Sequence, residues 1–406
     1  MKTSTRFVAL LTTMQCPLQC AHCIYECSPY RKERMSLQEM YRYIDQVSDQ
    51  GIPVLLLSGG EPFLIGRDLD LVVGYAAKKG LVTQCITAAH WATSKQRAVE
   101  RLRGLADAGL GFIAFSCDDY HQEFVDFQNV KRAVEAAVEV GLSFAINNIV
   151  TNKSTITKKV LLDEFRELLE TNKNYINAKK AEMIFKNLAQ QRDSHTLSDL
   201  VHTFSPNEKR SLATIRTYEF RSEPACEGSG RCTFAEDEEV PTYPIGHRVL
   251  NECNVLFSIL VFPDGAVKAC VGHMHSLTEA DLEIGNLLKE DLGSILARGG
   301  QHPVLKCLEW GGPSVIAQFL MEKEPSIRLN DRYRMSCHLC NDLFTNPVIR
   351  KLMYRHIDEL YEQLKPAPVQ RSAHFLIGGR SQEAKTRGSA GNLQPGGVEQ
   401  AGEANL

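Results

Sequence analysis

One unit recurs along the first half of the chain: an apolar run, a loop, an amphipathic segment and a glycine. Such alternation is typical of parallel sheets in which each helix crosses back over the sheet. Strands are predicted at 7–14, 54–57, 81–88, 112–116 and 143–150, with a weaker one near 182–185. Helices are predicted at 36–49, 68–79, 94–108, 129–140 and 157–170. Ser36 and Glu39 form a capping box at the start of the first helix. The fold class is therefore α/β, with too few units for an eight-fold barrel.

Two short motifs follow the first two predicted strands. Cys16, Cys20 and Cys23 lie on one loop, and Ser58-Gly59-Gly60-Glu61-Pro62 ends the second strand. Parallel α/β barrels place their active sites at these C-terminal strand ends. Three thiolates can hold three irons of a four-iron cluster and leave the fourth iron open. Two glycines allow a close approach of backbone to a ligand, and a carboxylate suits an ammonium partner.

The spacing C-x3-C-x2-C followed by Gly-Gly-Glu-Pro resembles the radical S-adenosylmethionine (SAM) superfamily over residues 6–190. The resemblance implies a partial (βα)6 TIM-like barrel and a [4Fe-4S] cluster bound by Cys16, Cys20 and Cys23. His22 stands where the family usually has an aromatic residue near the adenine. Residues 59–62 (Gly59, Gly60, Glu61 and Pro62) stand where the family contacts the methionine amino group of SAM.

Polar residues at the ends of the fourth and fifth strands are further SAM-binding candidates. Ser116 and Asp118 point to the same side of the chain, where the family binds the SAM carboxylate or ribose, although capping of a turn is the alternative. Asn147 and Asn148 interrupt an apolar strand, and a buried amide needs partners. We assign Asn147 to SAM. His121, on the loop after the fourth strand, is a candidate catalytic residue, and a solvated histidine is the alternative.

A second group of cysteines lies in the C-terminal part. Cys253 and Cys270 flank a predicted β-hairpin, and Cys337 and Cys340 form a C-x2-C pair. Four thiolates are enough for one auxiliary [4Fe-4S] cluster with no open iron. The pattern resembles the SPASM and twitch extensions of the same superfamily. Because no cysteine follows Cys340, the cysteine pattern favours the single-cluster twitch form over the full SPASM form. Zinc is the alternative occupant, since the ligands alone do not separate the two.

Other cysteines have weaker assignments. Cys226, Cys232 and Cys307 remain open as ligands of a second auxiliary cluster, as hydrogen-donating thiols or as ordinary reduced cysteines. Cys226 and Cys232 join His121 as candidate catalytic residues. Buried core positions are predicted for Cys85 and Cys117, and Cys27 is predicted to be a bystander. A structural zinc site built on the N-terminal cysteines would leave Cys16 and the Gly-Gly-Glu-Pro turn without a role.

The 406 residues allow two domains. We expect a radical SAM partial barrel at 1–190, a linker or lid at 191–250, a small α+β cysteine-rich twitch/SPASM-like domain at 251–365 and a disordered tail at 366–406. A net charge of −3 gives no indication of nucleic acid or membrane partners, and no signal peptide or spanning segment is apparent. The 13 cysteines cluster at ligand spacings, which argues against a disulfide framework. An oxygen-sensitive cluster indicates the cytoplasm.

The resemblance implies an enzyme that receives one electron from a flavodoxin- or ferredoxin-like protein. It cleaves SAM to a 5′-deoxyadenosyl radical, which takes hydrogen from a substrate carbon. The favoured substrate is a ribosomally made peptide that becomes crosslinked, thioether-bridged or epimerised. Oxidation or epimerisation of a sugar or aminocyclitol is the alternative, and the start of the barrel near residue 6 weakens the peptide hypothesis. A non-catalytic iron–sulfur electron carrier is the rival class, and it would have no need of the Gly-Gly-Glu-Pro turn.

Overall fold

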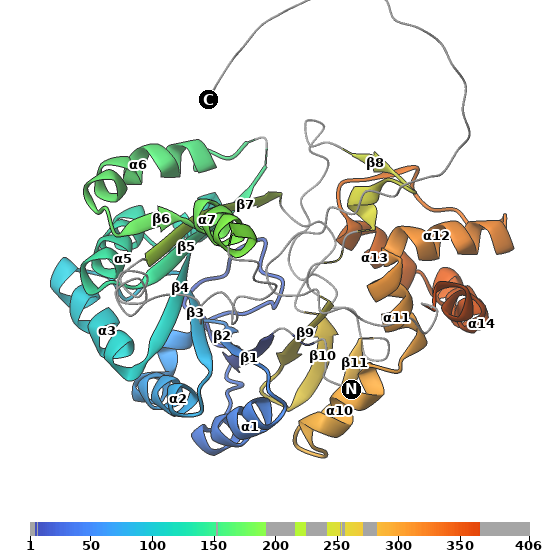
Figure 1. Cartoon of the computed structure of the whole chain (residues 1–406), viewed down its shortest axis with the longest axis horizontal. Coiled ribbons are helices and arrows are strands. Elements are labelled where there is room, and N and C mark those ends of the chain that lie inside the picture. The colour runs from blue at the N-terminus through green and yellow to red at the C-terminus, as the bar shows by residue number, and fades with distance from the viewer. Residues whose placement is uncertain are drawn as a thin grey trace, which may run out of the picture.

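The computed structural model describes residues 5, 7–151, 153–191, 216–224, 242–251, 253, 256–270 and 282–365. In Figure 1 a curved sheet occupies the middle of the molecule, with helices α1–α7 around one side and helices α10–α14 on the other. The predicted tail at 366–406 and most of the predicted lid lie outside the described residues. The proposed domain boundaries stay a prediction.

The main sheet has ten strands among the described residues. Their spatial order is β11 (Glu283–Asn286), β10 (Ala266–Cys270), β9 (Leu256–Val261), β1 (Phe7–Thr13), β2 (Val54–Gly59), β3 (Val82–Thr87), β4 (Leu110–Ser116), β5 (Ser143–Val150), β7 (Arg216–Pro224) and β6 (Tyr175–Asn177). All pairs from β9 to β6 are parallel, whereas β10 is antiparallel to both of its neighbours. The prediction of a parallel α/β sheet of the partial-barrel type is confirmed.

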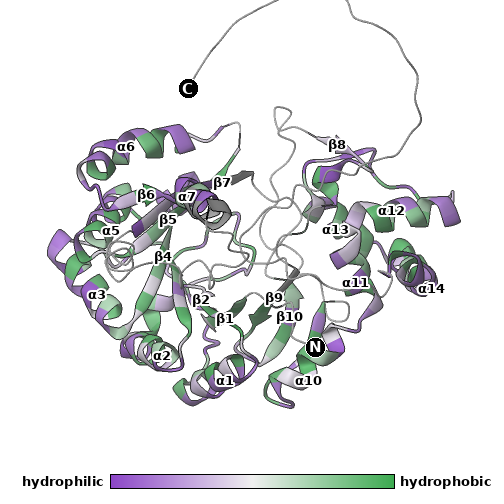
Figure 2. Ribbon diagram, in the orientation of Figure 1, coloured by the Kyte–Doolittle hydropathy of each residue, from purple (hydrophilic) through white to green (hydrophobic). Residues whose placement is uncertain are grey.

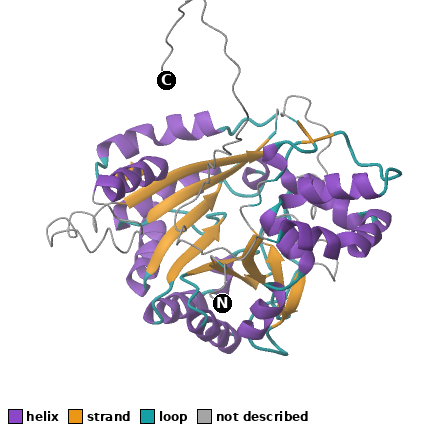
Figure 3. Ribbon diagram, turned by 45° about the vertical axis from the view of Figure 1, so that its right-hand side comes forward, coloured by secondary structure: helices purple, strands orange, loops and turns teal. Residues whose placement is uncertain are grey.

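Helices lie around the outside of the barrel strands (Figures 1 and 3). The helices in this half of the chain are α1 (Leu37–Asp49), α2 (Arg67–Lys78), α3 (Lys95–Ala108), α4 (Asp119–Gln122), α5 (Phe127–Val140), α6 (Lys158–Thr171) and α7 (Ala178–Gln191), with the 3-10 turn η1 (Pro62–Ile65). The capping box of Ser36 and Glu39 is formed. Gly109 and Gly141 end α3 and α5 in the left-handed conformation, which glycine adopts readily. The predicted helices are confirmed to within two residues.

Two predictions in the region after α6 need correction. The weak strand near 182–185 is wrong, because those residues lie inside α7, and the sixth strand in the sequence is the short β6. β7 falls within the segment predicted to be a linker or lid, yet it inserts between β5 and β6. Its sequence, RTYEFRSEP, alternates polar and apolar residues without an apolar run, so composition alone concealed the strand.

The C-terminal part continues the sheet of the barrel. The predicted hairpin of β9 and β10 is formed, and β9 pairs in parallel with β1. Five helices follow: α10 (Leu292–Gly299), α11 (Pro303–Trp310), α12 (Gly312–Lys323), α13 (Ser336–Thr345) and α14 (Pro347–Leu364). A small sheet joins β8 (Tyr243–Pro244) to β12 (Arg332–Tyr333), and a 3-10 turn η2 spans Arg248–Leu250.

One large hydrophobic core extends through both parts, from Val8 on β1 to Leu360 on α14. Figure 2 shows the hydrophobic residues gathered on the strands and on the helix faces turned toward them. Polar links also join the two parts: Arg42 on α1 donates to the Leu287 carbonyl at 3.2 Å, and the Leu292 amide donates to Gln46 at 2.6 Å. In the part of the chain described here, no helix combines the length and hydrophobicity that a bilayer crossing requires.

Candidate active site at the C-terminal ends of the strands

The cysteine loop runs from the end of β1 to the start of α1. The Cys16 amide donates to the Ser28 carbonyl at 3.0 Å, which joins two distant points of the loop. The Cys23 amide donates to the Cys20 carbonyl at 3.1 Å, which forms a local turn. Cys20 is buried, with Cys16, Cys23, Leu18, Ala88 and Val125 in the same apolar cluster. The three predicted cluster ligands therefore lie together.

The electrostatics of these thiols fit a bound cationic cluster. Burial raises the pKa of the Cys20 thiol above its usual range, and the neighbouring Cys16 and Cys23 thiolates raise it further. Three thiolates this close repel one another in a site that removes water. Thiols that bind a metal lose their protons to form thiolates, and the positive charge of the metal offsets the repulsion between them.

Gly59 and Gly60 pack closely against the backbone that leads into the cysteine loop. They therefore do more than leave space for a ligand. The Gly60 amide donates to the Thr13 carbonyl at 2.6 Å, and the Glu61 amide donates to the Gln15 carbonyl at 2.9 Å. A Cβ added at Gly60 would stand 2.0 Å from the Gln15 oxygen. At Gly59, where φ is +124°, it would stand 2.4 Å from the Thr13 oxygen. The turn thus fixes the backbone just before Cys16.

Substitution of Gly60 by Ala should therefore disturb the cysteine loop. We expect Gly60→Ala to lower the free energy of unfolding by about 3 kcal/mol, because the contacted atom is backbone and has little room to move. Urea unfolding followed by circular dichroism measures the change. The matched control is Gly74→Ala in α2, where the added Cβ meets nothing closer than 3.8 Å and helix propensity improves. Equal stability of the two variants would contradict the prediction.

Glu61 is a buried acid whose carboxylate has several hydrogen-bond partners. Its carboxylate is 1% exposed and accepts hydrogen bonds from the Phe63 amide at 3.1 Å and the Ala88 amide at 3.0 Å. The Thr87 hydroxyl donates to it at 2.9 Å, and His90 Nδ1 lies 3.6 Å away. Glu61 therefore ties the end of β2 to the end of β3. The sequence did not show these partners, which come from another strand, and SAM binding by Glu61 stays a prediction.

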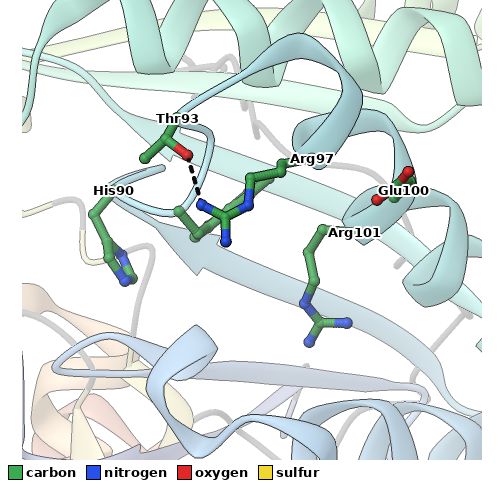
Figure 4. Close-up of a pocket in the computed structure, with 6 residues that line it drawn as sticks. His90, Thr93, Arg97, Glu100 and Arg101 are labelled. Carbon is green, nitrogen blue, oxygen red and sulfur yellow. Dashed lines mark hydrogen bonds between the residues drawn. The ribbon is translucent and has the colours of Figure 1, made fainter.

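A pocket of about 640 Å³ opens beside His90 (Figure 4). It is lined by His90, Trp91, Thr93, Arg97, Glu100 and Arg101. Arg97 donates to the Thr93 hydroxyl at 3.2 Å, as the dashed line shows. Trp91 stacks on Phe63 with ring centroids 4.4 Å apart. No residue predicted from the sequence lines this pocket, which adjoins the Glu61 network through His90.

Asp118, His121 and His22 form a second polar group, at the end of β4. Asp118 is fully buried and accepts hydrogen bonds from the amide and the Nδ1 of His121, at 3.0 and 2.9 Å. Burial raises the pKa of Asp118, but His121 and His22 lower it more, so it lies below its usual value. Burial lowers the pKa of His121, and Asp118 more than reverses this. Both shifts in pKa favour the charged forms of this pair.

This group adjoins the cysteine loop. The His22 ring lies 4.8 Å from the His121 ring and 5.0 Å from the Tyr120 ring, measured between centroids. Ligand atoms of Cys20, His22 and His121 all lie within 4.8 Å of one another. The structure thus brings together His22, Asp118 and His121, which the sequence assigned on separate grounds. His121 is an anchored partner of Asp118 and not a solvated loop histidine.

The two asparagines of β5 differ in their surroundings. Asn148 is buried and donates to the carbonyls of Cys117 and Ile156 at 2.8 and 2.9 Å. Asn147 is half-buried and stands opposite Ser116 in the β4–β5 register. Because Asn148 has structural partners, Asn147 and Ser116 are better placed for a ligand, and their SAM-binding role stays a prediction.

Three of the four predicted auxiliary ligands lie within electrostatic reach of the fourth, Cys340. Cys270 ends β10, while Cys337 and Cys340 lie in the first half of α13. Burial raises the pKa of the Cys340 thiol well above its usual value, and the thiolates of Cys337, Cys253 and Cys270 raise it further. The hairpin pair and the C-x2-C pair therefore share one electrostatic site. The donor set fits an all-cysteine metal centre.

The remaining cysteines separate into clear groups. Cys226 and Cys232 lie outside the described residues. Cys307 is buried in α11, where burial and then Asp358 raise its pKa to about 12. Cys85 and Cys117 are fully buried, as predicted.

Sequence reasoning missed two neighbours of the cluster loop. Cys27 is buried, and a hydrogen bond with Cys23 followed by burial raises its pKa above the usual range. Burial raises the pKa of Tyr25, and the thiolates of Cys27, Cys270 and Cys23 raise it further. Tyr25 thus lies within electrostatic reach of both cysteine groups. Only the position of Cys27 four residues after Cys23 hinted at this region in the sequence.

The sequence is similar to a protein-family model and to several known enzymes. Residues 10–171 match the sequence model described as "Radical SAM superfamily". The chain is 29% identical over 147 residues to the Fe-coproporphyrin III synthase of Methanosarcina barkeri, covering 33% of this chain and 35% of that protein. It is 23% identical over 280 residues to the GTP 3',8-cyclase of Saccharophagus degradans, covering 67% and 80%. It is 36% identical over 115 residues to the PqqA peptide cyclase of Rhizobium meliloti, covering 28% and 29%.

The alignments span 35% and 38% of the length of two curated relatives, the Fe-coproporphyrin III synthase and the AdoMet-dependent heme synthase of Oleidesulfovibrio alaskensis. Among solved structures, Streptococcus suis SuiB bound to precursor peptide SuiA has a TM-score of 0.45 and 14% identity, covering 77% of this chain and 73% of that one. The match over residues 10–171 contains the three cysteines and the Gly-Gly-Glu-Pro turn. Over this segment, the chain is similar to the radical SAM superfamily.

Proposed function

We propose that this protein is a radical SAM enzyme that cleaves SAM reductively and abstracts hydrogen from a carbon of its substrate. The observation that carries the proposal is the meeting of Cys16, Cys20 and Cys23 with the Gly59–Gly60 turn at the strand ends. When bound, the cluster and SAM supply a 5′-deoxyadenosyl radical. A non-catalytic electron carrier would not need the three-cysteine site with its open iron.

The protein's own residues have distinct proposed roles. Cys16, Cys20 and Cys23 hold three irons, and the turn at Gly59 to Pro62 receives the amino group of SAM. His22 stands beside the adenine, while Ser116, Asp118 and Asn147 bind the carboxylate or ribose. The Asp118–His121 pair holds His22 in place, since the rings are in contact. These roles are supported by the geometry above and by the similarity of residues 10–171 to the superfamily.

We further propose one auxiliary [4Fe-4S] cluster on Cys253, Cys270, Cys337 and Cys340. The effect of the other three thiols on the pKa of Cys340 supports a shared metal centre. Full cysteine ligation leaves no open iron, which favours a redox role over direct substrate binding. A flavodoxin- or ferredoxin-like protein is the proposed electron donor, in a reducing cytoplasm.

For the substrate, we propose a ribosomally made peptide that is crosslinked, thioether-bridged or epimerised. The 36% identity with a PqqA peptide cyclase supports this class. Relatives named for haem and GTP chemistry match with lower identity, and their names point to small molecules. A sugar or aminocyclitol is therefore the alternative outcome of the test.

The test of the function is direct. We expect the anaerobically reconstituted and reduced protein to convert SAM to methionine and 5′-deoxyadenosine, measured by liquid chromatography. Deuterium transfer from labelled peptide into 5′-deoxyadenosine would establish the peptide class, whereas transfer from labelled sugars would establish the alternative. An intact cluster that forms no 5′-deoxyadenosine with any substrate would overturn the proposal. The matched control is the same preparation without reductant.

A further inference from the structure

Cys27 is folded back onto the cysteine loop by a local turn. The Glu26 amide donates to the Cys23 carbonyl at 3.3 Å, and Glu26 itself has a φ of +52°. Left-handed backbone is uncommon for a residue other than glycine, and it is kept only where the surroundings require it. Ser28, the next residue but one, receives the Cys16 amide and forms an isolated bridge with Gln15. The turn therefore places Cys27 in the apolar cluster against which Cys16 and Cys23 pack.

The Cys27 side chain faces inward and contacts a cluster ligand. It is 1% exposed and packs with Ala9, Leu11, Met14 and Leu260, in the same apolar cluster as Cys16 and Cys23. Its sulfur donates to the Tyr25 carbonyl oxygen at 3.9 Å, and Cys23 packs against the apolar cluster that contains Cys27. Interaction with Cys23 also raises the pKa of the Cys27 thiol. A thiol has one proton to donate. A thiolate acceptor is favoured over a carbonyl, because hydrogen bonds to an ionised acceptor are stronger.

We propose that the Cys27 thiol donates a hydrogen bond to the Cys23 sulfur and so raises the reduction potential of the cluster held by Cys16, Cys20 and Cys23. This inference rests on the proposed function. Cys27 is a positioning and tuning residue and not a fourth ligand, because its thiol contacts a ligand sulfur in a dry apolar setting.

The direction of the effect follows from charge. Reduction adds an electron to the cluster and makes the ligand sulfurs more negative. A hydrogen bond to one of these sulfurs therefore stabilises the reduced state more than the oxidised state, and second-shell partners of this kind tune potentials. The Cys27 hydrogen bond acts in the dry setting of Leu11 and Leu260, where water screens it little. It makes the cluster easier to reduce by the donor protein.

The test compares three variants of the full chain after anaerobic reconstitution. Cys27→Ala removes the donor, Cys27→Ser restores a donor at the same position, and Cys85→Ala removes a buried thiol elsewhere in the core. The readout is a redox titration followed by electron paramagnetic resonance, using the signal that changes when SAM is added. We expect a more negative midpoint potential for Cys27→Ala, a potential closer to wild type for Cys27→Ser, and no shift for Cys85→Ala.

The iron content of each variant shows whether the substitution leaves the cluster in place. Cys27→Ala should retain the same number of irons as the wild type. A loss of iron in this variant would make Cys27 a ligand or a structural requirement and overturn the proposal. An unchanged potential, or equal shifts in Cys27→Ala and Cys27→Ser, would overturn it also. A wild-type protein without a SAM-responsive signal would instead contradict the proposed function itself.

Discussion

Replacement of Cys16, Cys20 and Cys23 together by Ala is expected to remove about four irons per chain and to abolish SAM cleavage. The reason is that these thiols are the three proposed ligands on the loop after β1, and the open iron that would receive SAM is lost with them. Iron content after anaerobic reconstitution and the yield of 5′-deoxyadenosine give the two readouts. Cys85→Ala is the control, since this thiol is buried in β3 and belongs to neither cysteine group.

The irons that remain in the triple variant report on the C-terminal cysteines. About four would match one auxiliary cluster on Cys253, Cys270, Cys337 and Cys340. About eight would require a second auxiliary cluster and bring in Cys226, Cys232 and Cys307. Zinc in place of iron would make the C-terminal centre a structural site. Full iron content with normal SAM cleavage would contradict the assignment of the first cluster.

The barrel was predictable because each unit carries local signals. Ser36 and Ser94 cap their helices, and Gly109 and Gly141 end theirs, so the strand–helix alternation is visible without tertiary information. β7 was not predictable in the same way. Its polar alternation resembles that of a loop, and its place in the sheet depends on pairing with β5 and β6, which are distant in sequence.

The candidate site, like the fold, was predictable from the sequence only where its residues lie close together in the chain. The proximity of the proposed ligands Cys16, Cys20 and Cys23 was predictable, because they share one short loop. The partners of Glu61 and Asp118 were not found, because Thr87, Ala88 and His121 reach them through strand ends and turns. The continuation of the barrel sheet by β9 was also hidden, since nothing in the hairpin sequence specifies β1 as its neighbour.

Glu61→Ala is expected to lower the free energy of unfolding of the apo protein by about 3 kcal/mol. The change leaves the Phe63 and Ala88 amides without their acceptor in a buried setting, and unpaired buried donors carry a desolvation penalty. We also expect SAM affinity to fall by about 2 kcal/mol, the contribution of a charge-assisted contact to the amino group. Urea unfolding and anaerobic calorimetry with SAM measure the two effects separately.

Two further variants separate the structural role of Glu61 from its ligand role. Glu61→Gln keeps one carbonyl acceptor but sets an amide donor against the Ala88 amide, so it should lose part of the stability and most of the charge-assisted affinity. Glu100→Ala is the control, because this exposed acid on α3 accepts a hydrogen bond only from Gln96 among the bonds found in the described part of the chain. Reduced stability with unchanged SAM affinity would make Glu61 solely the link between β2 and β3. Unchanged stability would mean that the amides of Phe63 and Ala88 find other partners, and that the carboxylate is free for SAM.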